Sequence, residues 1–111
     1  MKLTERRCRP CEGGVPPLTD AELEAGLAEL PGWTVGGDGR LLRSVECKDF
    51  ADAVARLSRI AEVAEAEDHH PDLTVSDYRR LTVRIWTHAI GGLSENDLIL
   101  AAKVDGPLGG A

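Results

Sequence analysis

The chain has 111 residues, enough for one domain with a modest core and too few for two. Thirteen Lys and Arg against 19 Asp and Glu give a net charge of -6, which disfavours nucleic-acid binding because that binding depends on neutralising phosphates. No apolar run approaches the roughly 20 residues that a membrane span requires, and MKLTERRCRPCEGG lacks the apolar part of a secretory signal. We therefore expect a cytoplasmic protein with neither nucleic acid nor membrane as partner.

Residues 1–17 predict an irregular N-terminal arm, because CEGGVPP is rich in Gly and Pro. The arm holds Cys8 and Cys11 as Cys-Arg-Pro-Cys, and Cys47 is the third cysteine of the chain. A structural zinc site needs four ligands, and the usual second pair of Cys or His at short spacing is missing. We expect reduced thiols and no metal.

A first helix is predicted to begin at Thr19 or Asp20, because Thr19 and a Glu three residues later form a capping box. Its apolar stripe is Leu23, Leu27 and Leu30. The helix ends at residues 31–32, Pro-Gly. Residues 33–35 and 40–46 then read as two strands around a Gly-rich turn, which predicts a hairpin.

A long second helix is predicted to begin after Asp49, which can cap it. Its apolar residues recur at helical spacing: Phe50, Val54, Leu57, Ala61 and Ala64. The helix ends near His69 and His70, because Pro71 disfavours helical geometry in the residue before it.

Residues 73–75 and 81–87 predict a second pair of strands around a turn at residues 76–77. In the last strand Leu81, Val83 and Ile85 share one face, while Thr82, Arg84, Trp86 and His88 share the other. A third helix is expected from Ser94 to about Val104, before Gly-Pro.

The predicted order is α-β-β-α-β-β-α. Hairpins separated by one long helix indicate an α+β fold, in which a four-stranded antiparallel sheet carries its helices on one face. The domain is expected to cover residues 18–105, followed by a tail over residues 106–111.

His69 and His70 stand where a helix stops and a loop begins, and His88 lies at the end of the last strand. Imidazole, with an ordinary pKa of about 6.5, both donates and accepts protons near neutrality. Three histidines can therefore line one acid-base pocket. On local sequence alone, an equally weighted alternative is a pair of exposed histidines at the negative end of the helix dipole. A three-histidine zinc site ranks third, because adjacent residues seldom both ligate one ion.

Two acidic residues can likewise have either a functional or a purely structural role. Glu65 lies one helical turn before His69 and can orient its imidazole or belong to a solvated acidic face. Asp97 lies three residues after Ser94, and capping the third helix is the role that its spacing favours. Trp86 is more typical of a core or interface than of a ligand platform.

Three motifs together carry a family resemblance: EAEDHHP at 65–71, YRRLTV at 78–83 and THAIGGLSEND at 87–97. With Pro-Gly-Trp after the first helix and Lys-Asp-Phe opening the second, the chain resembles the pterin-4a-carbinolamine dehydratase family from about Leu18 to Lys103. That resemblance implies the same antiparallel sheet with helices on one side.

The resemblance also implies an activity, the dehydration of 4a-hydroxytetrahydropterin to quinonoid dihydropterin, without a metal or organic cofactor. The implied catalytic residues are His69, His70 and His88. The implied substrate-binding residues are Glu65, Pro71, Thr87, Ala89, Ile90 and Asp97.

The partner implied is a small-molecule pterin, together with further copies of the chain in a homodimer or homotetramer. An alternative of another class is a non-catalytic RuBisCO assembly factor, because the sequence also resembles dehydratase-like proteins with that role. All three pocket histidines are present here, and this favours the enzyme.

Overall fold

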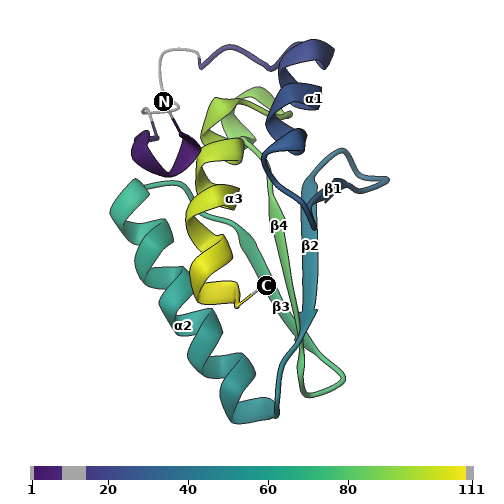
Figure 1. The fold of residues 1–111 in the computed structure, drawn as a ribbon, viewed down its shortest axis with the longest axis vertical. Coiled ribbons are helices and arrows are strands. Elements are labelled where there is room, and N and C mark those ends of the chain that lie inside the picture. The colour runs from purple at the N-terminus through teal and green to yellow at the C-terminus, as the bar shows by residue number, and fades with distance from the viewer. Residues whose placement is uncertain (1, 9–14, 110–111) are drawn as a thin grey trace.

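The computed structural model describes residues 2–8 and 15–109, which form a sheet and a layer of helices (Figure 1). In chain order the elements are η1 (Leu3–Glu5), α1 (Asp20–Ala28), β1 (Thr34–Val35), β2 (Leu41–Glu46), α2 (Phe50–Glu67), β3 (Asp72–Ser76), β4 (Arg80–Ile85), η2 (His88–Ile90) and α3 (Glu95–Leu108). Among the described residues, no helix combines the length and apolar character needed to cross a membrane.

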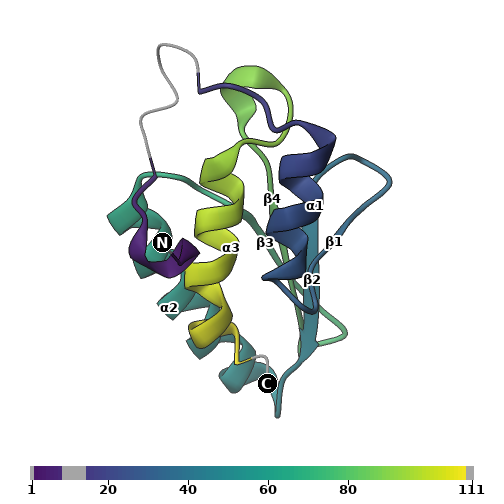
Figure 2. The same ribbon diagram turned by 45° about the horizontal axis from the view of Figure 1, so that its top comes forward.

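The four strands form one antiparallel sheet in the order β1-β2-β4-β3, so β1 and β3 are its edges. The helices α2 and α3 lie side by side on one face of this sheet (Figure 1), and α1 lies next to α3 on the same side (Figure 2). Leu81, Val83 and Ile85 point into that layer and are fully buried. The predicted α+β fold, with helices on one face, is confirmed.

Helix starts follow the predicted capping chemistry. Thr19 Oγ1 accepts the backbone N–H of Glu22 at 3.1 Å, and Glu22 Oε1 accepts that of Thr19 at 2.9 Å. Asp49 Oδ1 accepts the backbone N–H of Asp52 at 2.8 Å and caps α2. These bonds satisfy donors that a helix leaves without partners in its first turn.

The buried face of α2 differs from its apolar stripe. Phe50 is 57% exposed and Val54 is 41% exposed. The buried residues are instead Ala53, Ile60, Ala64 and Glu67, and of the stripe only Ala64 is among them. The helix packs chiefly on α3, and this contact decides which of its residues are buried and leaves Phe50 and Val54 on its flank.

The predicted end of α3 at about Val104 is wrong, because the helix continues through Gly106 and Pro107 to Leu108. Leu108 is fully buried in the core, and burying a Leu side chain stabilises by about 1.5–3 kcal/mol. That gain offsets the backbone hydrogen bond that Pro107 cannot donate. The helix stops at Gly109, whose φ of 77° suits a glycine C-cap.

Candidate active site

The two adjacent histidines have different environments because of Asp68. This residue ends α2 in the left-handed conformation, with φ 52°, and turns the chain sharply before His69. The side chain of His69 is then only 5% exposed, whereas that of His70 is 56% exposed. The pair is therefore one buried imidazole and one at the surface.

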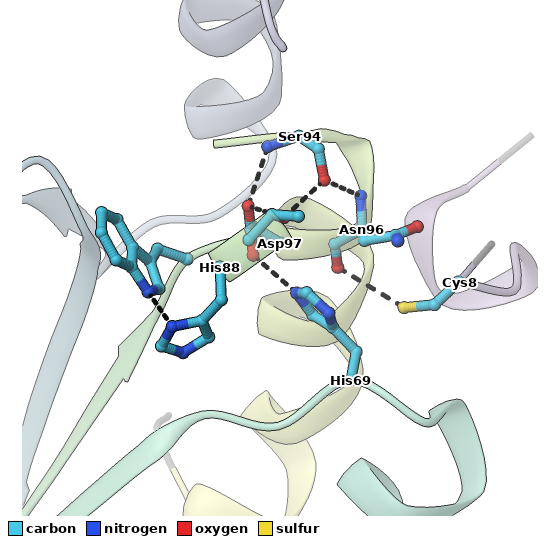
Figure 3. A network of polar contacts seen from close by, with 8 residues as sticks. Cys8, His69, His88, Ser94, Asn96 and Asp97 are labelled. Carbon is cyan, nitrogen blue, oxygen red and sulfur yellow. Dashed lines mark hydrogen bonds and ion pairs between the residues drawn. The ribbon is translucent and has the colours of Figure 1, made fainter. Parts of the chain in front are cut away.

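His69 contacts a fully buried carboxylate, that of Asp97 (Figure 3). Asp97 Oδ1 lies 2.7 Å from His69 Nε2. Its Oδ2 accepts the hydroxyl of Thr87 at 2.8 Å and the backbone N–H of Ser94 at 2.8 Å. Three donors thus converge on one carboxylate, which is the usual condition for holding such a group inside a protein.

These contacts determine how His69 can act. Asp97 already accepts two hydrogen bonds at Oδ2, so its Oδ1 accepts a third from His69 Nε2–H. The contact with Asp97 therefore orients the imidazole of His69. A buried carboxylate that orients an imidazole is an arrangement found in acid-base catalysts.

A cavity of about 370 Å³ lies where the loop after α2 faces η2. Its lining residues are Asp68, His69, His70, Pro71, Asp72, His88 and Ala89. The structure therefore brings together five of the residues that the sequence singles out, including all three histidines. Asp68 and Asp72 were missed, although both flank the His-His-Pro motif directly.

The other four predicted site residues lie around this cavity. Thr87 and Asp97 are buried beneath His69 and do not line the cavity. Glu65 stands on the last turn of α2, mostly exposed, with its Oε1 3.5 Å from His70 Nε2. Ile90 belongs to η2 and lies outside the lining.

A second polar cluster supports the segment that carries His69. Glu67 is buried and accepts the backbone N–H of Cys8 at 2.9 Å and the ammonium of Lys103 at 2.9 Å, with Arg7 at 3.2 Å. Burial, reinforced by the charge of Glu67, raises the pKa of Cys8 to about 12. Residues 2–8 are thus attached to the end of α2, and Cys8 is held as a thiol. Cys11 lies outside the described residues.

Glu67 predicts a pH-dependent contribution to stability. Burial by itself raises the pKa of this carboxyl, but the Cys8 N–H and Lys103 outweigh it and hold the pKa below its ordinary value near 4.5. A lowered native pKa stabilises the fold above the ordinary value, and the benefit is lost as the pH falls through the native value. Glu67→Gln should therefore be less stable than the wild type at pH 7 and equally stable in strong acid. Urea unfolding at several pH values measures this difference.

Glu62→Gln is the matched control for this prediction, because Glu62 lies on the exposed side of the same helix. Its stability difference from the wild type should be small at every pH. A Glu67→Gln difference that stays constant from pH 7 into strong acid would contradict the role given to the charge.

Within residues 2–8 and 15–109, no three His, Cys, Asp or Glu side chains are grouped as ligands of one ion. His69 Nε2 and Asp97 Oδ1 are directed at each other.

Comparisons with known proteins agree with the fold and the motifs. The family model described as pterin 4 alpha carbinolamine dehydratase matches residues 16–106. A relative from Halorhodospira halophila, provisionally named as a pterin-4-alpha-carbinolamine dehydratase, is 48% identical over 95% of this chain and 96% of its own length. A relative from Nitrosomonas europaea with the same provisional name is 50% identical over 93% of this chain and 90% of its own.

Two solved structures are also similar. A protein from Brucella melitensis described as a transcriptional coactivator/pterin dehydratase has a TM-score of 0.76 and 34% identity, covering 84% of this chain and 99% of its own. A structure described as a pterin dehydratase-like protein that is a RuBisCO assembly factor in the alpha-carboxysome has a TM-score of 0.58 and 22% identity. The match covers 72% of this chain and 93% of that protein. At 22% identity, the similarity to the assembly factor is a similarity of fold only. From the family match and the identity to its relatives, this chain belongs to the pterin 4 alpha carbinolamine dehydratase family.

Proposed function

We propose that the protein catalyses the dehydration of 4a-hydroxytetrahydropterin to quinonoid dihydropterin. The observation that carries this proposal is the His69–Asp97 pair, which lies at the wall of a cavity shared with His70 and His88. A buried carboxylate that orients an imidazole at a cavity wall suits a proton-transfer catalyst.

The reaction is an elimination of water. The C4a–O bond breaks and the hydroxyl takes up one proton, while N5 loses one proton and its electron pair forms the C4a=N5 double bond. One proton is consumed and one released, and no electrons are exchanged with a second reactant. The protein must therefore supply a proton donor and a proton acceptor at adjacent atoms of the substrate.

His69 is the group that we assign to proton transfer, because Asp97 orients its imidazole at the wall of the cavity. Thr87 and Ser94 hold Asp97 in place from the opposite side. The remaining cavity residues contact the substrate in this proposal: His70, Pro71, His88 and Ala89. Glu65 contributes from the rim, and Ile90 from η2.

An assay on enzymatically generated 4a-hydroxytetrahydropterin tests the proposal. Formation of quinonoid product should be faster with the protein than in buffer alone. A rate equal to that of buffer, measured with folded protein, would overturn the proposal. Co-purification with RuBisCO subunits would in that case favour the assembly-factor alternative.

We also propose that the protein is a homodimer or homotetramer. Phe50 and Val54 expose apolar surface on the flank of α2, and β1 and β3 are open sheet edges. Small proteins commonly protect such edges by pairing with a second copy. Light scattering at micromolar concentration should give a mass of two or four chains.

A double substitution tests whether the exposed flank of α2 contributes to assembly in addition to the sheet edges. If α2 contributes to assembly, replacing both Phe50 and Val54 with Glu should lower the measured mass, because charge would be buried in the contact. Ala55→Glu, on an exposed face of the same helix, is the control and should leave the mass unchanged. A wild-type mass of one chain across dilution would contradict self-association altogether.

A further inference from the structure

Cys8 contacts both elements that carry the active-site pair. Its backbone N–H donates to Glu67 Oε1 at 2.9 Å, at the last residue of α2. Its Sγ donates to the backbone oxygen of Asn96 at 3.5 Å, in the first turn of α3 (Figure 3). Glu67 stands two positions before His69. Asn96 immediately precedes Asp97. The N-terminal part of the chain therefore bridges the two elements that meet at the His69–Asp97 hydrogen bond.

Two arginines next to Cys8 contact the same two elements. Arg7 Nη2 donates to the backbone oxygen of Ala66 at 3.3 Å. Ala66 belongs to the last turn of α2, where backbone carbonyls have no partner within the helix, so Arg7 satisfies one of them. Arg6 Nη1 lies 3.4 Å from Glu95 Oε1, at the first residue of α3. The contacts of Cys8 are thus part of a wider attachment of the N-terminal part of the chain.

The carboxylate of Glu67 is the point where these contacts converge. Its side chain is 6% exposed. Besides the Cys8 N–H at Oε1, it holds the Lys103 ammonium 2.9 Å from Oε2 and Arg7 Nε 3.2 Å from the same oxygen. Hydrogen bonds between charged groups are stronger than those between neutral groups, and burial reduces the solvent screening that weakens surface ion pairs. One carboxylate therefore links α2, α3 and residues 6–8.

The turn after Glu67 depends on its neighbours for its shape. Asp68 is in the left-handed conformation, with φ 52°. A side chain disfavours this conformation, so a residue keeps it where neighbouring contacts determine it. Glu67 and its partners stand on one side of the turn, and the His69–Asp97 hydrogen bond stands on the other. Loss of the contacts on the first side would let the turn relax and would move His69 relative to Asp97.

We propose that Glu67 is a positioning residue of the active site. It fastens Lys103 and the N-terminal part of the chain to the end of α2, and it thereby holds His69 against Asp97 during turnover. Glu67 and residues 2–8 are not among the residues that line the cavity, so they act through His69 and not on the substrate. This role rests on the dehydratase activity proposed above.

Amide hydrogen exchange tests the positioning role without turnover. The His69 N–H is bonded to the last turns of α2, and the Ser94 N–H is bonded to Asp97 Oδ2. The Cys47 N–H, hydrogen bonded just before the other end of α2, is the reference. In Glu67→Ala the first two amides should exchange faster by about tenfold relative to the change at Cys47, because local opening adds to global unfolding. An equal change at all three amides would show that Glu67 contributes only to global stability and would overturn the proposal.

Turnover of the same variant tests the consequence for catalysis. Glu67→Ala should lower kcat about tenfold with KM within about twofold, because a misplaced catalytic group slows the reaction and leaves the substrate contacts in place. Glu62→Ala is the matched control, since Glu62 lies on the exposed side of the same helix. It should leave kcat, KM and the exchange of all three amides unchanged. A wild-type kcat in folded Glu67→Ala would contradict the positioning role.

A second pair of variants tests the N-terminal part of the chain and leaves Glu67 in place. Proline has no backbone N–H, so Cys8→Pro removes the hydrogen bond to Glu67 Oε1. Cys8→Ser keeps that N–H and places a hydroxyl donor near the backbone oxygen of Asn96. We expect kcat to fall about fivefold in Cys8→Pro and to stay within about twofold of the wild type in Cys8→Ser. Equal kcat values in the two variants would overturn the part given to Cys8, and Cys8→Pro decides the proposal if Glu67→Ala does not fold.

A wild-type protein without any dehydratase activity would instead count against the proposed function. The exchange measurement would then still decide whether Glu67 holds the end of α2 against α3. Faster exchange at His69 and Ser94 than at Cys47 in the variant would support that structural role.

Discussion

Replacing Asp97 with Ala is expected to lower the free energy of unfolding by about 3–5 kcal/mol, because it removes the acceptor shared by three buried hydrogen bonds. The variant leaves His69 Nε2–H, the Thr87 hydroxyl and the Ser94 N–H in the interior without their acceptor. Each buried donor left without a partner costs about 1–3 kcal/mol. Urea unfolding measures the loss, and turnover should fall with it because His69 is no longer oriented.

The control for Asp97 is the equivalent residue of another capping box. Glu22 accepts the backbone N–H of Thr19 at the start of α1, as Asp97 accepts that of Ser94, but it is exposed. Glu22→Ala should therefore destabilise much less than Asp97→Ala. An Asp97→Ala loss of only about 1 kcal/mol, the ordinary value of a helix cap, would show that the contacts to His69 and Thr87 contribute little.

Asp97 illustrates how far local sequence predicts the site. Spacing from Ser94 correctly predicts that this residue caps a helix, because capping depends on three neighbouring positions. It does not predict that the same carboxylate accepts from His69, 28 positions earlier in the chain. That contact depends on how the loop after α2 packs against α3, and so the pairing of these two residues required the fold.

Two other features depend on tertiary packing in the same way. The apolar spacing of α2 predicts a helix correctly, but its buried face is chosen by close approach to α3, and Phe50 remains exposed. The Gly-Pro after Val104 predicts a helix end, yet burial of Leu108 carries α3 through it. Strand pairing, in contrast, follows from alternation and short turns, and the predicted sheet is confirmed.

The relation between Trp86 and His88 was within reach of the sequence. Alternation along the last predicted strand places both residues on one face, and the structure shows them in contact. The different surroundings of His69 and His70 could not be predicted from the sequence, because they depend on the left-handed conformation of Asp68.

His69→Ala is expected to lower turnover by roughly a hundredfold or more, the usual contribution of a positioned acid-base group. The melting temperature should fall as well, because Asp97 loses a buried donor. His69→Gln separates the two effects, since its amide can still donate to Asp97 but cannot exchange protons. We expect this variant to recover most of the stability and none of the activity, as measured by thermal unfolding and by product formation.

His70 provides the comparison within the same motif. Its side chain is largely exposed and its contact with Glu65 is at the surface, so His70→Gln should leave the melting temperature nearly unchanged. It should also lose less turnover than His69→Gln, because its carboxylate partner, Glu65, is exposed and orients the imidazole less firmly. Near wild-type turnover in His69→Gln would mean that His69 contributes only to the stability of the core and that another group transfers the proton. A larger loss in His70→Gln than in His69→Gln would identify the exposed histidine as that group.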